Sequence, residues 1–235
     1  MPAQRRMTTW GVFAIAFLTM ISAEHSARAT LIVTAICADG VYVRSDRRNT
    51  IKHPSKPVEY RDVLNKIFVT KDKKIIIYNH GINVINRTSW RMHAATLAAK
   101  LQKSATADIE SALKLFETTL ARDMAAEFAR NKFDSFCAFV VIIKIPDGRY
   151  RAGEISWRKN RRVKKMKLGR FIRSGSGNRY FHPQVRQKDN KHWASLTVKQ
   201  ARSEIAELFD SAVKRQGEAR GTEFSSTYDE LILVK

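Results

Sequence analysis

The sequence predicts an α+β domain in which helices cover the outer faces of two antiparallel sheets. Two observations carry this prediction: strand-like apolar runs fall into separate blocks, and stretches with helical periodicity lie between those blocks. The order along the chain is strands, a pair of helices, strands, one helix and a final strand. Residues 30–235 are long enough to form one domain with a full hydrophobic core.

The expected strands are runs of β-branched and apolar residues that end at turn signals. In the first hairpin, the turn pair Asp39-Gly40 separates two such runs. The second hairpin turns at residues 71–73, and the third at residues 146–148. The strand regions predicted in this way are residues 30–46, 66–78, 136–145, 150–157 and 230–234.

Three helices are expected from apolar residues at helical spacing. They span about residues 89–103, 107–132 and 197–214. Only residues 104–106 join the first two helices, so these two should pack side by side as an antiparallel pair.

The first 29 residues have the organisation of a secretory signal peptide. Two arginines precede an almost uncharged apolar run over residues 10–23, and residues 27–29 form a small-x-small cleavage pattern. The apolar run is shorter than the roughly 20 residues that span a bilayer, and no later stretch is long enough. We therefore expect an exported protein, periplasmic or secreted, whose mature chain begins at Thr30. An uncleaved N-terminal anchor is the alternative.

The start of this expected mature chain resembles that of a proteasome β subunit. Mature chains of that family begin with threonine and soon reach Asp-Gly-Val and then Asp-x-Arg-x-Thr, which this sequence has at residues 39–41 and 46–50 with the family's spacing. Further matches are the strand start at residues 65–68, the turn at 80–81 and the Gly-Ser-Gly turn at 175–177. The final helix and strand fit the family as well.

The resemblance implies the four-layer αββα sandwich of N-terminal nucleophile (Ntn) hydrolases, with two antiparallel sheets flanked by helices. It also implies a threonine peptidase that acts on a peptide or amide substrate and requires no metal and no organic cofactor. Because proteasome relatives assemble as rings, a homo-oligomer is implied too.

The chemistry expected of these residues is acyl transfer. An N-terminal threonine carries a hydroxyl nucleophile and a free α-amine, and the amine, with a reference pKa of roughly 8, can take the hydroxyl proton if a nearby cation lowers that pKa. For Thr30, the candidate cation is Lys66, which Asp46 would hold in place and keep charged. By resemblance, the Gly81 amide would bind the tetrahedral oxyanion, and Ser176 would join the hydrogen bonds around the amine.

Two features depart from the family's pattern. Ala29 stands where the family usually has a glycine, so signal peptidase rather than self-cleavage would expose the threonine. The family's turn that supports the catalytic amine has its nearest counterpart in Glu223-Phe-Ser-Ser226, where glutamate replaces aspartate. The supporting residues predicted from the resemblance are Arg48, Thr50, Glu223 and Ser226.

The segment 157–170 is unusually basic and lengthens the connection before the Gly-Ser-Gly turn. Its cations are Arg158, Lys159, Arg161, Arg162, Lys164, Lys165, Lys167 and Arg170. Such a segment can bind an anionic polymer or membrane surface through charge, or it can be an ordinary solvated hairpin. No aromatic residues are interleaved with the cations, so we expect no sequence-specific nucleic-acid binding.

The net charge and the two cysteines bear on the kind of partner and on disulfide formation. The formal net charge is +21; residues 1–29 hold three of the 43 basic and one of the 22 acidic residues, so residues 30–235 keep +19. This excess favours acidic partners. Cys37 and Cys137 lie in apolar runs typical of buried thiols, although an oxidising compartment would also permit a disulfide between them.

The preferred hypothesis is an exported threonine-type amide hydrolase, in particular a peptidase. The alternative is an inactive domain of the same fold that binds anionic envelope polymers or nucleic acid through its basic segment. A third hypothesis is an amidase or acylase with a small-molecule substrate, because a fold alone does not determine a substrate.

Overall fold

The structure, a computed structural model, describes residues 25–26, 30–52, 57–62, 64–104, 108–130, 136–159, 161–181, 190–221 and 224–234. The expected signal peptide therefore lies almost entirely outside the described residues. No helix in the described part of the chain is long and apolar enough to cross a membrane.

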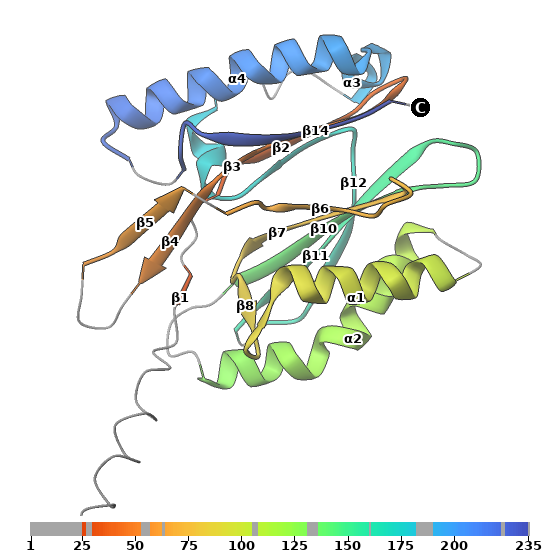
Figure 1. Ribbon diagram of the computed structural model, residues 1–235, viewed down its shortest axis with the longest axis vertical. Coiled ribbons are helices and arrows are strands. Elements are labelled where there is room, and N and C mark those ends of the chain that lie inside the picture. Colours follow the sequence, from red (N-terminus) through yellow and green to blue (C-terminus); the bar gives the residue numbers. More distant parts are fainter. Residues whose placement is uncertain are drawn as a thin grey trace, which may run out of the picture.

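Two large antiparallel sheets stack face to face, and helices cover their outer faces (Figure 1). The five-stranded sheet has the order β12 (Lys164–Leu168), β11 (Tyr150–Arg158), β10 (Phe136–Lys144), β7 (Ile75–Gly81) and β6 (Ile67–Val69). The four-stranded sheet has the order β13 (Phe171–Ser174), β2 (Ile32–Ile36), β3 (Gly40–Asp46) and β14 (Tyr228–Val234). Helices α1 (Trp90–Lys103) and α2 (Ile109–Arg130) cover the first sheet, and α3 (Asn190–Ser195) and α4 (Val198–Glu218) cover the second. The predicted four-layer αββα sandwich is confirmed.

The core consists of apolar clusters that fill the interfaces between the layers. Strand β10 explains how one strand can serve two interfaces. Phe139 and Val141 pack in the cluster with α1 and α2, whereas Val140 and Ile142 belong to the cluster between the sheets. A strand that is covered on both faces has a continuous run of apolar residues, and residues 137–143 have this pattern.

The helix boundaries follow from local capping. The Ser89 side chain accepts the Met92 N–H and begins α1, and Thr197 forms a capping box with Gln200 at the start of α4. Helices α1 and α2 pack together as the short connection predicted. Helix α4 continues to Glu218, beyond the predicted end at residue 214, because its buried face continues from Ala212 to Gln216, whose side chain is hydrogen-bonded to Phe224.

Several short elements were not expected from the sequence. The small sheet β1-β4-β5 projects from the sandwich and consists of His25–Ser26, Arg48–Lys52 and Glu59–Asp62. Strands β8 (Val84–Ile85) and β9 (Thr88–Ser89) form a small hairpin before α1, and η1 (Ser176–Tyr180) is a 3-10 helix where only a turn was expected. These elements, like β13 and α3, are too short to produce a recognisable period.

Candidate active site

The centre of the candidate site is the carboxylate of Asp46, at the end of β3. Its Oδ1 accepts the Leu31 N–H at 2.6 Å and lies 2.8 Å from the ammonium Nζ of Lys66. Its Oδ2 accepts the Arg48 N–H at 2.9 Å. The Asp46 N–H in turn donates to the Leu31 carbonyl at 3.0 Å. Asp46 therefore fixes the residue that follows Thr30 and binds the lysine through the same oxygen.

Burial gives this ion pair its electrostatic character. The side chains of Asp46 and Lys66 are 0% and 2% exposed. Burial raises the pKa of Asp46 and lowers the pKa of Lys66, because a low-dielectric interior disfavours both charges. Their mutual attraction and hydrogen bond oppose both shifts. Each charge is therefore tolerated in the interior because the other is present.

A second ion pair lies beside the first. The Arg48 guanidinium contacts Asp62 on β5 in a bidentate manner, with Nε to Oδ1 at 2.8 Å and Nη2 to Oδ2 at 2.9 Å. The hydrogen bond from Arg48 lowers the pKa of Asp62. Arg48, predicted as a supporting residue, thus joins β4 to β5, and its backbone N–H binds the central carboxylate of Asp46.

Thr30 is buried against the Gly-Ser-Gly turn. Its carbonyl accepts the Gly177 N–H at 3.1 Å. Gly175 has φ +94°, and a Cβ at that position would lie 2.0 Å from the Thr30 carbonyl oxygen. Only glycine allows so close an approach without moving the backbone. The turn therefore places Ser176 next to the start of the expected mature chain.

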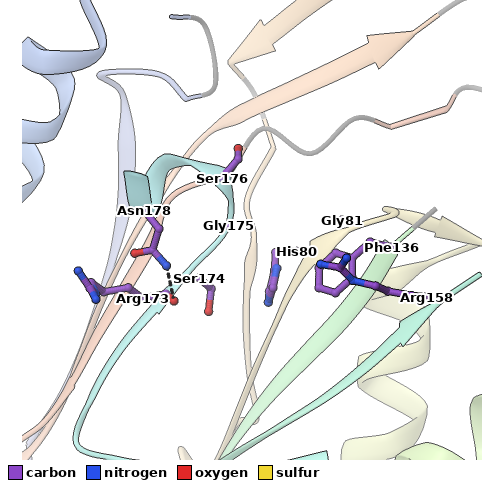
Figure 2. Close-up of a pocket in the computed structure, with 9 residues that line it drawn as sticks. All are labelled: His80, Gly81, Phe136, Arg158, Arg173, Ser174, Gly175, Ser176 and Asn178. Carbon is purple, nitrogen blue, oxygen red and sulfur yellow. Dashed lines mark hydrogen bonds between the residues drawn. The ribbon is translucent and has the colours of Figure 1, made fainter. Parts of the chain in front are cut away.

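Gly81 occupies a comparable position on the other sheet. It ends β7 with φ +103°, and a Cβ there would lie 2.2 Å from the Phe136 carbonyl oxygen. A pocket of about 310 Å³ connects this glycine with the Gly-Ser-Gly turn (Figure 2). Its lining residues are His80, Gly81, Phe136, Arg158, Arg173, Ser174, Gly175, Ser176 and Asn178. Gly81 and Ser176, expected from the resemblance alone, thus line one pocket between the two sheets.

Sequence reasoning missed some of the residues of this pocket. His80 is 8% exposed, its ring centroid lies 5.3 Å from that of Phe136, and its Nε2 lies 3.5 Å from Glu154 Oε2. Arg173 comes from β13, and the Asn178 side chain holds its carbonyl with a 2.9 Å hydrogen bond. His80 stands directly before the expected Gly81, which was the one available signal; Arg173 had none.

The supporting turn after α4 differs from the expectation. Glu223 and the Thr50 side chain lie outside the described residues, and Ser226 is exposed. The buried serine is Ser225, whose hydroxyl accepts the Arg47 N–H at 3.2 Å. This hydrogen bond ties the turn to the residue that follows Asp46.

Gln216, at the end of α4, holds the same turn from the other side. Its side-chain amide accepts the Phe224 N–H at 2.9 Å and donates to the Phe224 carbonyl at 2.7 Å. Sequence reasoning also missed this buried glutamine, because its partner lies across an irregular loop.

The cations of the basic segment separate into groups on the β11–β12 hairpin. Lys165 pairs with Glu117 of α2 at 2.6 Å, and Lys167 pairs with Glu110 of the same helix at 2.5 Å. The remaining cations lie elsewhere. Arg158 lines the 310 Å³ pocket, and a neighbouring pocket is lined by Arg158, Arg161, Arg162 and Lys164. Arg170 donates a hydrogen bond to the Ile36 carbonyl. Lys159 is not among the residues that line either pocket. Two of the eight cations therefore have carboxylate partners on α2, and binding of an anionic partner by the segment stays a prediction.

Cys37 and Cys137 are free, buried thiols in different apolar clusters. Burial raises the pKa of each thiol to about 12. Among the described residues, no group of three or more His, Cys, Asp or Glu side chains is placed to hold a metal ion.

The fold, two stacked antiparallel sheets with helices on their outer faces, is that of proteasome-related, Ntn-type proteins. Among the solved structures it matches is Anbu, the ancestral β-subunit, from Yersinia bercovieri, with a TM-score of 0.55 and 12% identity, covering 86% of this chain and 80% of that one. Anbu from Hyphomicrobium sp. strain MC1 gives a TM-score of 0.54 and 11% identity, covering 87% and 82%. The Anbu complex from Pseudomonas aeruginosa, described as a helical assembly, gives 0.50 and 16%, covering 87% and 81%. No family model and no curated protein matches the sequence.

These matches correct the family resemblance. The sequence motifs pointed to a proteasome β subunit, but the matched structures are Anbu proteins, which are proteasome-like and form a distinct family. Nothing in the matches supports the signal peptide that accompanied that resemblance. At 11 to 16% identity the likeness shows the fold alone.

Proposed function

We propose that this protein is an N-terminal threonine amide hydrolase, in particular a peptidase, with Thr30 as its nucleophile. The observation that carries the proposal is the position of one buried carboxylate. Asp46 Oδ1 accepts hydrogen bonds from both the Leu31 N–H and the Lys66 ammonium. A buried cation and the backbone of the residue that follows Thr30 are therefore bound to the same oxygen. An ion pair that served only the surface would be exposed, and a core that served only stability would not contain a lysine, because burying a lysine is costly.

The proposed reaction begins once Thr30 is N-terminal. Lys66 lowers the pKa of the threonine amine through like-charge repulsion, so the neutral amine takes the proton of the hydroxyl. The Thr30 oxygen forms a bond to the substrate carbonyl carbon, and the Gly81 N–H binds the oxyanion that develops. The carbon–nitrogen bond then breaks, and the departing amine takes the proton from the threonine amine. Water hydrolyses the resulting ester by the reverse proton movements and restores Thr30.

The pocket supports this assignment of roles. Gly81 and Ser176 line the same cavity, and the Gly175 backbone contacts the Thr30 carbonyl. A substrate carbonyl in this cavity would therefore approach the threonine between the two sheets. Ser176 would contribute to the hydrogen bonds around the amine.

Liberation of Thr30 is part of the proposal. We propose cleavage after Ala29 during export, which would give a periplasmic or secreted enzyme. Residues 25–26 form β1 against residues 51–52 of β4, so this cleavage would also remove one strand from the small projecting sheet.

A homo-oligomer is proposed on the basis of exposed apolar side chains on β14. This strand is at the edge of its sheet, and Tyr228, Ile232 and Val234 are 42%, 44% and 63% exposed on it. The helical assembly described for the Anbu complex of Pseudomonas aeruginosa is consistent with self-association. Light scattering of the purified protein at several concentrations measures the assembly size directly.

One observation favours the alternative of an inactive, anion-binding domain. Arg161, Arg162 and Lys164 line a pocket of about 410 Å³, and among its described lining residues Glu154 is the one that carries a carboxylate. In that case, reversing these charges would abolish polymer binding, whereas Lys66→Met would leave binding unchanged.

The test combines processing with activity. The N-terminus of protein from the exported fraction is read by mass spectrometry, and wild type and Thr30→Ala are assayed on a fluorogenic peptide library and on small amides. Thr34→Ser is the matched control, because it removes a methyl group from a buried threonine on β2 and keeps the hydroxyl that donates to Tyr78. We expect an N-terminal Thr30, peptide hydrolysis by wild type and Thr34→Ser, and none by Thr30→Ala. A different N-terminus, or equal activity of wild type and Thr30→Ala, would overturn the mechanism; hydrolysis of small amides alone would favour an amidase.

A further inference from the structure

We propose that the cavity of about 410 Å³ beside the β11–β12 hairpin, called the cationic pocket below, binds a diphosphate group. This site goes beyond the proposed function, because Thr30, Asp46 and Lys66 are not among the described residues that line it. It also differs from the polymer-binding alternative, since the ligand is small and the domain need not be inactive.

The alternation of side chains along β12 separates the cations of this hairpin into two faces. Lys165 and Lys167 point toward α2, where carboxylates of that helix pair with them. Lys164 is on the opposite face, because successive side chains of a strand alternate. It pairs in register with Ser156 of β11, and both residues line the cationic pocket. The charges on the α2 face are thus compensated within the fold, whereas that of Lys164 faces the pocket.

A turn at the tip of the hairpin brings three arginines to the same pocket. The Arg161 N–H donates to the Arg158 carbonyl at 3.1 Å, and Arg162 follows directly in the chain. All three arginines line the pocket and are exposed. Within the part of the chain that the structure describes, no ion pair joins these arginines or Lys164 to a carboxylate. Their charges are therefore available to a ligand.

An aromatic ring supports one wall of the pocket. The Arg158 guanidinium carbon lies 5.1 Å from the centroid of the Phe136 ring, and Figure 2 shows the two side chains against each other. A ring contact holds a guanidinium through its π-face and leaves the N–H groups at its edge free. Those N–H groups lie in one plane, which suits bidentate binding of two phosphate oxygens.

The charge of the pocket matches that of a diphosphate group. Its described lining residues include four cations and one carboxylate, which leaves an excess of three positive charges. The carboxylate belongs to Glu154, whose side chain is 14% exposed and whose Oε2 lies 3.5 Å from His80 Nε2. Two linked phosphate groups carry about three negative charges near neutral pH, since each phosphate group brings about −1.5. One phosphate group would leave part of the positive charge uncompensated.

The size of the pocket favours a small anion over a polymer. Its volume of about 410 Å³ is within the range of small-molecule sites, which is roughly 300 to 1,000 Å³. A cavity of this size can surround a diphosphate group, whereas a long chain would extend beyond it.

The two faces of the hairpin supply a matched pair of variants. Arg161→Gln/Arg162→Gln removes two cations from the pocket, and Lys165→Gln/Lys167→Gln removes two from the α2 face. Both double variants have the same net charge, so a difference between them reports the position of the cations. Thermal unfolding of each variant shows that it is folded.

Isothermal titration calorimetry of the full chain with sodium diphosphate at low salt measures binding. We expect diphosphate to bind about tenfold more tightly than orthophosphate or citrate, and more weakly as sodium chloride rises. Arg161→Gln/Arg162→Gln should weaken binding by about tenfold or more, whereas Lys165→Gln/Lys167→Gln should change it by about twofold or less. Glu154→Gln removes the opposing charge and should tighten binding.

Adenosine diphosphate distinguishes the sources of the group. Affinity equal to that of inorganic diphosphate would show that the diphosphate group alone is recognised, and tighter binding would show that a nucleotide carries it; both outcomes support the proposal. Thr30→Ala should bind diphosphate as wild type does, so failure of the hydrolase proposal would leave this result unchanged.

Three results would overturn the diphosphate site. These are no detectable binding at millimolar diphosphate, citrate binding as tight as that of diphosphate, and equal losses in the two double variants. Binding of long-chain polyphosphate or DNA that diphosphate does not displace would also overturn it, in favour of the polymer-binding alternative.

Discussion

Asp46 Oδ1 lies 2.8 Å from Lys66 Nζ, and neither side chain is more than 2% exposed. The same oxygen accepts the Leu31 N–H at 2.6 Å. A single atom thus connects the buried lysine to the backbone directly after Thr30. The stability of the fold and the geometry of the candidate site therefore depend on the same ion pair, and the two can be tested together.

Asp46→Asn should destabilise the protein strongly. The new side chain has the same shape, but it leaves the Lys66 ammonium buried without its counter-charge, which costs about 3 to 5 kcal/mol of unfolding free energy. Urea denaturation measures this loss, and the peptide assay should show loss of activity. Asp62→Asn is the control, because the Arg48–Asp62 pair is 20% and 34% exposed and such pairs contribute about 1 kcal/mol or less. Similar losses for the two variants would contradict the assigned role of Asp46.

Asp62 should contribute stability only above the acid range. The hydrogen bond from Arg48 lowers the pKa of Asp62 below its ordinary 3.8 in the folded state, so the unfolded chain takes up the proton first as pH falls. The difference in unfolding free energy between wild type and Asp62→Asn should therefore be constant above about pH 5 and shrink as pH falls through the acid range. Urea titrations at a series of pH values measure it. A difference that grows on acidification would show that the sign is wrong.

Gly175→Ala should damage the site more than Gly148→Ala. Both glycines have positive φ, at +94° and +81°, so each substitution costs about 1 kcal/mol for the left-handed backbone alone. At Gly175 the new Cβ would also lie 2.0 Å from the Thr30 carbonyl oxygen, whereas nothing lies within 4 Å at Gly148. We expect Gly148→Ala to keep its activity and Gly175→Ala to lose both stability and activity. Thermal unfolding and the peptide assay give both readouts.

The two cysteines should be unreactive in the folded protein. Their side chains are buried, and burial raises the pKa of both Cys37 and Cys137 to about 12, so little thiolate forms at pH 8. Intact mass spectrometry after iodoacetamide treatment should show no adduct on native protein and two adducts after denaturation without a reductant. A protein that takes up none even when denatured would contain a disulfide instead.

The layers of the fold could be predicted because their signals are local. The turn at Asp39-Gly40 and the helical spacing in α2 and α4 appear within short windows of sequence, and these elements formed close to the expected residues. Asp46 could be singled out because its spacing from Thr30 follows a known motif, and Lys66 because it stands at a strand start that resembles the family's, a few residues later than usual. The mutual contact of the two residues and their complete burial became visible only in the structure.

The walls of the pocket could not be predicted, because sheet register brings them together. Pairing of Cys137 with Gly81 sets Phe136 beside the glycine, and pairing of Arg173 with Val33 brings β13 beside β2. None of these pairs is close in sequence. The ion pairs of the basic segment could not be predicted for a similar reason: the α2 carboxylates that engage Lys165 and Lys167 lie about 50 residues earlier in the chain.

The most direct test of the central claim is to locate the acyl-enzyme. Processed wild-type protein and its Thr30→Ala variant are treated with a reactive peptide ester that has a slowly hydrolysed acyl group, quenched in acid, digested and mapped by tandem mass spectrometry. The proposed mechanism predicts one acyl group on wild type, attached to the side-chain oxygen of an N-terminal Thr30, and none on Thr30→Ala. An acyl group on any other residue, or equal labelling of both proteins, would contradict it.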